Sequence, residues 1–273
     1  MRLLWGLVFA AVPAWAQSAP GTPAAPLRDP TPRHVTFTLE SRALGEPRVI
    51  NVYTPPGYVS LAGTSFPVVY MPDGGMAEDF PHIANTLDSL IARRAIAPVI
   101  LVGIENTERR RDLTGPTAVP SDSAIARRVG GSAEFRRFLR AELMPEIRRR
   151  YRSTDETTIV GESLAGLFIV ETFLLEPDLF RRYIALSPSL WWNGGILLRM
   201  APQRLEELTS LPRTLYLTAA TEPGIAAETA ALAGILREHA PAGLVWYYEP
   251  RPDLEHGTIF RLAVPAAFVK ALR

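Results

Sequence analysis

The sequence predicts an α/β fold with a mostly parallel central sheet, antiparallel strands at its N-terminal end and helices on both faces. Two early stretches alternate apolar and polar residues with a period of two, which is typical of half-buried antiparallel strands. After them, short apolar runs alternate with amphipathic helical patterns, which indicates parallel strands joined by helices. With 273 residues, 47% of them apolar, the chain is long enough to bury such a sheet.

The first residues have the pattern of an export signal. A positive charge and a short apolar run precede Ala14-Trp15-Ala16, whose small residues resemble a signal-peptide cleavage site. We predict a signal peptide over residues 1–16 and a periplasmic or secreted protein with no stable membrane span after cleavage; the alternative is an uncleaved anchor. Residues 17–33, rich in Pro, Ala and Gly, are expected to form a flexible linker. Residues 34–273 then form the α/β domain.

The composition argues against several classes of function. The chain has no cysteine, so no disulfide can form and the fold depends on its core. Its formal net charge is +1, and the predicted signal peptide contains one arginine and no acid, which leaves the mature chain formally neutral. A neutral domain gives no electrostatic basis for nucleic-acid binding. No histidine or carboxylate pair has the spacing of metal ligands and no glycine-rich phosphate loop occurs, so we predict neither a metal nor a cofactor. The oligomeric state is left open.

The order of the elements follows from these patterns. The predicted strands cover residues 35–39, 48–53, 67–71, 98–103, 157–160, 183–186, 214–218 and 244–248. The predicted helices run near residues 78–94, 132–151, 164–175, 225–239 and 257–272. Residues 105–131 are long, polar and weakly periodic, and they follow a strand at the edge where α/β sites form.

The most informative motif is Gly161-Glu162-Ser163-Leu164-Ala165-Gly166, between a β-branched strand and an apolar helix. A serine on so tight a turn stands clear of the sheet, and its neighbours must be small because strand and helix approach closely. Ala165 replaces the usual glycine and keeps the volume small. This order is the nucleophile elbow of the α/β-hydrolase fold, so we predict that Ser163 is a catalytic nucleophile; the alternative is a plain strand–helix turn.

A serine hydroxyl needs a base to accept its proton, and the base needs an acid to orient it. His256 follows the last strand and precedes the final helix, where this fold has its general base. The alternative is a surface histidine that caps the helix. Glu222, after the penultimate strand, is the predicted acid. Asp253 and Glu255 are rivals, and a Ser–His pair without an acid is the remaining alternative.

The negative oxygen of a tetrahedral intermediate needs hydrogen-bond donors that are already in place. One predicted donor is the backbone N–H of Leu164, directly after the serine. The second is expected from the loop that follows the third strand, where Gly75 is the first choice and Gly74 and Met76 are the alternatives.

Five motifs along the chain are Tyr70-Met71-Pro72-Asp73-Gly74-Gly75, Asn106-Thr107 to Arg111-Asp112-Leu113-Thr114, the segment from Gly161 to Phe168, Ser187-Pro188-Ser189-Leu190-Trp191-Trp192, and Glu255-His256-Gly257-Thr258. Together they resemble the Putative esterase family of α/β-hydrolases, which includes esterase D-like enzymes and siderophore (enterochelin-type) esterases. The resemblance implies ester hydrolysis by Ser163 and His256. It also implies that Arg111, Trp191 and Trp192 lie near the substrate entrance, although the two tryptophans could equally cap the core.

The sequence therefore predicts a serine esterase that acts through an acyl-enzyme on siderophore esters or small acyl esters. Two alternatives use the same scaffold. One is an acyltransferase, in which another alcohol replaces water, and the other is a catalytically inactive binding protein.

Overall fold

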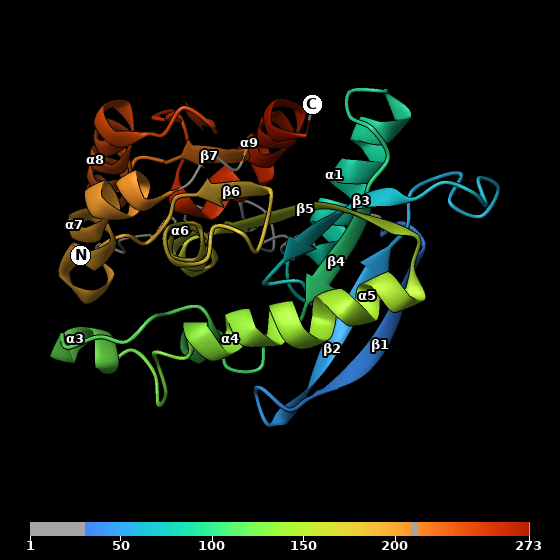
Figure 1. Ribbon diagram of the computed structural model, residues 1–273, viewed down its shortest axis with the longest axis horizontal. Helices are drawn as coiled ribbons and strands as arrows, with labels where there is room; N and C mark the ends of the chain where they lie inside the picture. The colour runs from blue at the N-terminus through green and yellow to red at the C-terminus, as the bar shows by residue number, and fades with distance from the viewer. Residues whose placement is uncertain (1–30, 209–211, 273) are drawn as a thin grey trace, which may run out of the picture.

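An eight-stranded sheet forms the centre of the computed structural model, which describes residues 31–208 and 212–272. The strand order is β1-β2-β4-β3-β5-β6-β7-β8 (Figure 1). β2 is antiparallel to both of its neighbours, and the other neighbouring strands of this sheet are parallel. The strands are β1 His34–Ser41, β2 Glu46–Tyr53, β3 Phe66–Met71, β4 Ile100–Ile104, β5 Ser153–Glu162, β6 Arg182–Leu186, β7 Arg213–Thr218 and β8 Leu244–Tyr248.

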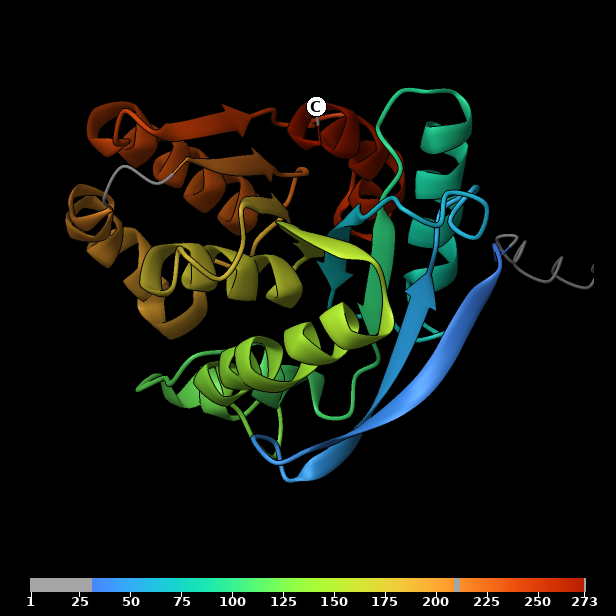
Figure 2. The same ribbon diagram turned by 45° about the vertical axis from the view of Figure 1, so that its right-hand side comes forward.

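Helices cover both faces of this sheet (Figure 2). α1 and α9 pack on one face, and α4 to α8 pack on the other. The helical elements are α1 Phe80–Ala92, α2 Arg109–Asp112, α3 Pro120–Ser123, α4 Ser132–Phe138, the π-helix η1 Leu139–Leu143, α5 Met144–Arg150, α6 Leu164–Leu175, α7 Trp192–Glu207, α8 Pro223–His239 and α9 His256–Ala271.

The central strands bury both of their faces. On β3, Val68 and Tyr70 join the core beneath α4 to α8, whereas Val69 and Met71 join the core beneath α1 and α9. Successive side chains of a strand point to opposite faces, so a continuous apolar run fills both cores. The predicted fold class, a mostly parallel sheet covered on both sides, is confirmed.

The short helices α2 and α3, within the segment 105–131, were not predicted, and two longer helical regions also differ from the prediction. The helix predicted over 132–151 contains a π-helical turn at Leu139–Leu143. Pro145 follows that turn and has no N–H to donate to the preceding turn, which accounts for the irregular hydrogen bonding. α7 was not predicted at all. After its first residue, Trp192, it contains Asn193, Gly194 and Gly195 at positive φ, and these three residues interrupt the helical pattern near its start.

The predicted signal peptide over residues 1–16 lies outside the described residues, as does nearly all of the linker over 17–33. In the part of the chain that the structure describes, none of the helices has the length and apolar character needed to cross a membrane.

The parallel strands bring their carboxyl ends to one edge of the sheet. The loops after β3, β5, β7 and β8 therefore meet there, although they are far apart in the sequence. These four loops contain the predicted oxyanion glycine, nucleophile, acid and base. The topology alone thus assembles the candidate site.

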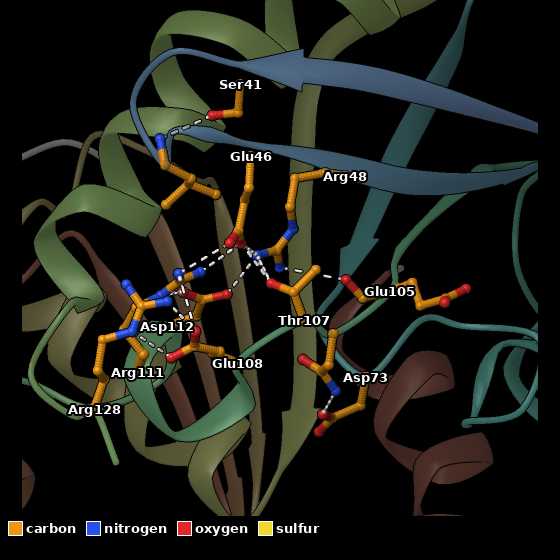
Figure 3. Close-up of polar contacts among 12 residues, drawn as sticks. Ser41, Glu46, Arg48, Asp73, Glu105, Thr107, Glu108, Arg111, Asp112 and Arg128 are labelled. Atoms are coloured by element: carbon orange, nitrogen blue, oxygen red, sulfur yellow. Dashed lines mark hydrogen bonds and ion pairs between the residues drawn. The ribbon is translucent and has the colours of Figure 1, made fainter. Parts of the chain in front are cut away.

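An ion-pair network fixes the segment after β4 against β2 (Figure 3). The buried Asp112 accepts hydrogen bonds from Arg48 on β2 and from Arg111, each over 2.6 Å. Glu46 accepts two further bonds from Arg111 and one from Arg48. The hydrogen bond from Arg111 is the largest of the effects that lower the pKa of Glu46 to about 2. In this network two arginines thus face two carboxylates, and Arg48 and Asp112 are buried.

We predict that Asp112→Asn lowers the free energy of unfolding by about 3 kcal/mol, because it removes the buried one of the two carboxylates that Arg48 and Arg111 share and leaves the buried Arg48 with only Glu46 as an anion. Urea unfolding followed by circular dichroism measures the change. Arg149→Gln is the matched control, since Arg149 pairs with Glu146 on the exposed surface of α5 and its loss should leave the midpoint unchanged. Equal midpoints for the two variants would contradict the prediction.

Candidate active site

Ser163 occupies a strained turn between β5 and α6. Its backbone has φ 61° and ψ −117°, a conformation that residues with a side chain rarely adopt. The turn is held on both sides, because the Ser163 N–H donates to the Leu186 carbonyl over 3.0 Å and the Ser163 carbonyl accepts from Leu167 and Ser189. The hydroxyl group is thereby fixed at the carboxyl edge of the sheet.

Small neighbours make this turn possible. A Cβ atom on Gly161 would lie 2.6 Å from the Cβ of Ala165, and one on Gly166 would lie 2.9 Å from the Leu186 carbonyl oxygen. Neither position has room for a side chain without moving strand and helix apart. The structure thus gives the physical reason for the small residues in the motif.

The structure brings the predicted nucleophile and base together. Ser163 Oγ lies 3.1 Å from His256 Nε2, although the two residues are 93 positions apart in the sequence. His256 is the first residue of α9, whose N-terminus is closed by a capping box between Glu255 and Thr258. A second hydroxyl, Ser189 Oγ, lies 3.4 Å from Ser163 Oγ. The pair is within proton-transfer reach.

Of the three acids considered from the sequence, the structure brings Glu222 to the outer side of the imidazole. Its Oε1 accepts a hydrogen bond from the His256 backbone N–H over 2.5 Å, and its Oε2 lies 3.8 Å from His256 Nδ1. Asp253 instead accepts two hydrogen bonds from Arg251. Glu255 uses its side chain in the capping box of α9. Both rivals are therefore engaged elsewhere.

A fourth carboxyl group, which sequence reasoning missed, also faces the imidazole. Glu162, the last residue of β5, has its Oε1 3.7 Å from His256 Nδ1. Burial is the main cause that raises the pKa of Glu162 to about 8, and the charges of Asp79, Asp73 and Glu222 raise it further. The only signal in the sequence was an acidic residue directly before the predicted nucleophile.

The two predicted oxyanion donors differ in their surroundings. Leu164 is the first residue of α6, where backbone N–H groups have no acceptor within the helix. The Gly75 N–H instead donates to Glu78 Oε2 over 2.7 Å. The Gly75 N–H can therefore bind an oxyanion only if it first breaks its hydrogen bond to the Glu78 carboxylate. The loop itself is held by Asp73, which accepts two hydrogen bonds from Arg109.

The resemblance placed three residues near the substrate, Arg111, Trp191 and Trp192. They differ in how far their side chains are engaged in contacts within the protein. The Arg111 guanidinium is bound by Glu46 and Asp112 in the network of Figure 3, so its contact with substrate stays a prediction. Trp192 is buried and donates its indole N–H to the Gly115 carbonyl over 2.8 Å. Trp191 is 37% exposed and packs its ring 5.9 Å from that of Trp192. Trp191 is therefore the member of the pair with surface to offer a ligand.

The described residues contain no cluster of three or more His, Cys, Asp or Glu side chains arranged to hold a metal ion.

Comparison with protein families gives a match to the family described as “Putative esterase” over residues 41–213. The chain is 34% identical over 154 residues to the ferri-bacillibactin esterase BesA of Bacillus subtilis, which covers 49% of this chain and 51% of that protein. It is 28% identical over 195 residues to the siderophore triacetylfusarinine C esterase of Aspergillus fumigatus, covering 65% and 63%. The chain thus spans about half the length of BesA and less than two thirds of the second relative.

Solved structures show the same fold. An IroE-like serine hydrolase from Shewanella oneidensis superposes with a TM-score of 0.80 at 28% identity, over 87% of this chain and 79% of that one. The siderophore hydrolase EstA from Aspergillus nidulans superposes with a TM-score of 0.71 at 21% identity, over 94% and 97%. The chain therefore has the α/β-hydrolase fold.

The close approach at the elbow generates a prediction about Gly161. Gly161→Ala should lower the free energy of unfolding by about 1–3 kcal/mol, because the new methyl group overlaps Ala165. Urea unfolding measures this change. Gly234→Ala is the control: Gly234 lies inside α8 with its nearest contact at 4.0 Å, so the substitution should stabilise the protein by up to about 1 kcal/mol. The prediction is wrong if both variants shift stability in the same direction.

Proposed function

We propose that this chain, which belongs to the Putative esterase family, is a serine hydrolase of carboxylic esters that acts through an acyl-enzyme. The observation that carries the proposal is the 3.1 Å separation of Ser163 Oγ and His256 Nε2 on the strained turn after β5. A hydroxyl group this close to an imidazole can give up its proton as it attacks a carbonyl carbon.

The proposed reaction has two halves. In the first, Ser163 attacks the ester carbonyl, His256 accepts the serine proton, and the amides of Leu164 and Gly75 bind the negative oxygen. The alcohol then leaves with the proton from His256, and the acyl group stays on Ser163. In the second half, His256 accepts a proton from water as the water oxygen attacks the acyl carbon; the bond from that carbon to Ser163 Oγ then breaks, Oγ takes the proton back from His256, and the carboxylic acid leaves. Glu222 orients the imidazole and stabilises its charged form throughout.

The relatives support a substrate class. One relative is named as a ferri-bacillibactin esterase and the other as a siderophore triacetylfusarinine C esterase. We propose a siderophore ester or a small acyl ester as the substrate of this chain. The exposed ring of Trp191 offers a flat apolar surface against which such a substrate can pack. The predicted signal peptide supports action in the periplasm or outside the cell.

Replacing the nucleophile tests the proposal. Ser163→Ala should abolish hydrolysis of p-nitrophenyl acetate and labelling by a fluorophosphonate probe, because it removes the oxygen that forms the covalent bond. Ser189→Ala is the matched control, since it removes the neighbouring hydroxyl group and should still be labelled by the probe. Circular dichroism checks that both variants fold. Full turnover by Ser163→Ala would overturn the proposal, and products esterified to an added alcohol would instead indicate an acyltransferase.

A further inference from the structure

Three buried polar atoms meet at the outer side of the catalytic imidazole without a hydrogen-bond partner. They are His256 Nδ1, Glu162 Oε1 and Glu222 Oε2. The nitrogen lies 3.7 Å from the first oxygen and 3.8 Å from the second, so the two carboxyl groups are almost equally distant from it. A buried polar atom without a partner is costly, so a small side-chain rotation that closes either gap is favoured.

The required tautomer explains why the acceptor matters. Nε2 must be free to take the serine proton, so the ring proton of the neutral imidazole must reside on Nδ1. That N–H needs an acceptor, and in the charged imidazolium it needs a negative one. Glu222 and Glu162 approach the nitrogen from different elements, the N-terminus of α8 and the end of β5.

We propose that Glu162 is a second positioning residue for His256, so that the two glutamates serve as alternative acceptors for the Nδ1 proton. The proposal rests on the proposed esterase function of Ser163 and His256. Glu222 is the acceptor with the fixed position, because its Oε1 accepts a hydrogen bond from the His256 backbone N–H over 2.5 Å. Glu162 takes over as acceptor when Glu222 is lost or turned away.

The charges around Glu162 decide when it can act. Asp79 before α1, Asp73 after β3 and Glu222 before α8 are negative neighbours that raise its pKa, and Arg109 on α2 is the positive neighbour that lowers it. With burial the pKa is about 8, so the carboxyl group is neutral at pH 7 and negative at pH 9. A negative charge beside Nδ1 stabilises the imidazolium ion. Activity should therefore rise through pH 8 in the native protein.

Loss of Glu222 should shift this balance toward Glu162. The Glu222 charge is one of the causes that hold the pKa of Glu162 high. Without that charge Glu162 ionises at lower pH, and it becomes a charged acceptor near neutrality. The site should thus lose less activity than a triad with a single acid, for which replacing the acid costs about 10⁴-fold in kcat.

A double-mutant cycle tests the proposal with Glu162→Gln, Glu222→Gln and their combination, measured as kcat for p-nitrophenyl acetate from pH 6 to 10. We expect Glu222→Gln to lose about tenfold, the effect of one weakened hydrogen bond, and its alkaline rise to move to lower pH. Glu162→Gln should keep activity near pH 7 and lose the rise through pH 8. The combination should lose about 10⁴-fold, more than the product of the single losses.

Asp253→Asn is the matched control, because it removes a carboxylate three positions from His256 that pairs with Arg251 instead. It should change neither the rate nor the pH profile. Glu162→Met, of similar length and without an acceptor oxygen, replaces Glu162→Gln if that variant does not fold. The proposal is overturned if Glu222→Gln alone loses the full 10⁴-fold, or if Glu162→Gln behaves like Asp253→Asn in both backgrounds.

A second readout does not depend on turnover. In proton NMR of protein with ¹⁵N-labelled histidine, the Nδ1 proton of His256 should stay protected from exchange in both single variants. In the combination only neutral amide oxygens remain as acceptors, so the protection should fall. Loss of protection in Glu222→Gln alone would overturn the proposal. If the native protein neither hydrolyses the ester nor reacts with a fluorophosphonate, the proposed function fails, and the NMR result still decides whether the two carboxyl groups share the proton.

Discussion

The close approach of β5 and α6 at Ser163 is the constraint on which the rest of the site depends. The positive φ of Ser163 carries strain of about 1–3 kcal/mol. It persists because three backbone hydrogen bonds hold the turn and because Gly161 and Gly166 let the strand, the helix and the residues after β6 come together. The hydroxyl position is thus set by backbone packing, and the imidazole reaches it from the start of α9, after β8. The loop after β8 connects to His256, the first residue of α9. The capping box between Glu255 and Thr258 fixes where this helix begins and so fixes the position of His256.

Much of the fold could be predicted because its cause is local. Apolar runs such as 67–71 and 157–160 are strands buried on both faces, and the predicted helix over 164–175 has the same bounds in the structure. The prediction of helices from their apolar periodicity was wrong where the backbone departs from regular helical geometry. α7 has three residues at positive φ directly after its first residue, and the helical region over 132–150 contains a π-helical turn close to a proline. A one-dimensional pattern contains the spacing of residues but not these departures from helical geometry.

The site could be predicted as far as strand order determines it. Ser163 and His256 follow the ends of parallel strands, so their meeting is a consequence of topology. The choice among acids depends instead on what each side chain touches. Asp253 is next to Arg251 and Glu255 is at a helix N-terminus, whereas Glu222 and Glu162 reach the imidazole through space. For the same reason the pairing of Arg111 with Glu46, 65 positions away, was invisible in the sequence.

The polar residues of 105–131 act mainly as attachments within the protein. The network at Asp112 ties the start of this segment to β2, and the Trp192 indole ties Gly115 to the start of α7. Further along, Asp122 accepts a hydrogen bond from the backbone N–H of Asn193. In a chain without cysteine, such buried polar contacts replace covalent cross-links in fixing a long segment to the sheet. Because Arg109 from the same segment holds Asp73, these attachments extend to the loop of Gly75. A substitution within residues 105–131 should therefore alter the position of the loop of Gly75 at the proposed oxyanion site, even where the substituted residue does not contact the substrate.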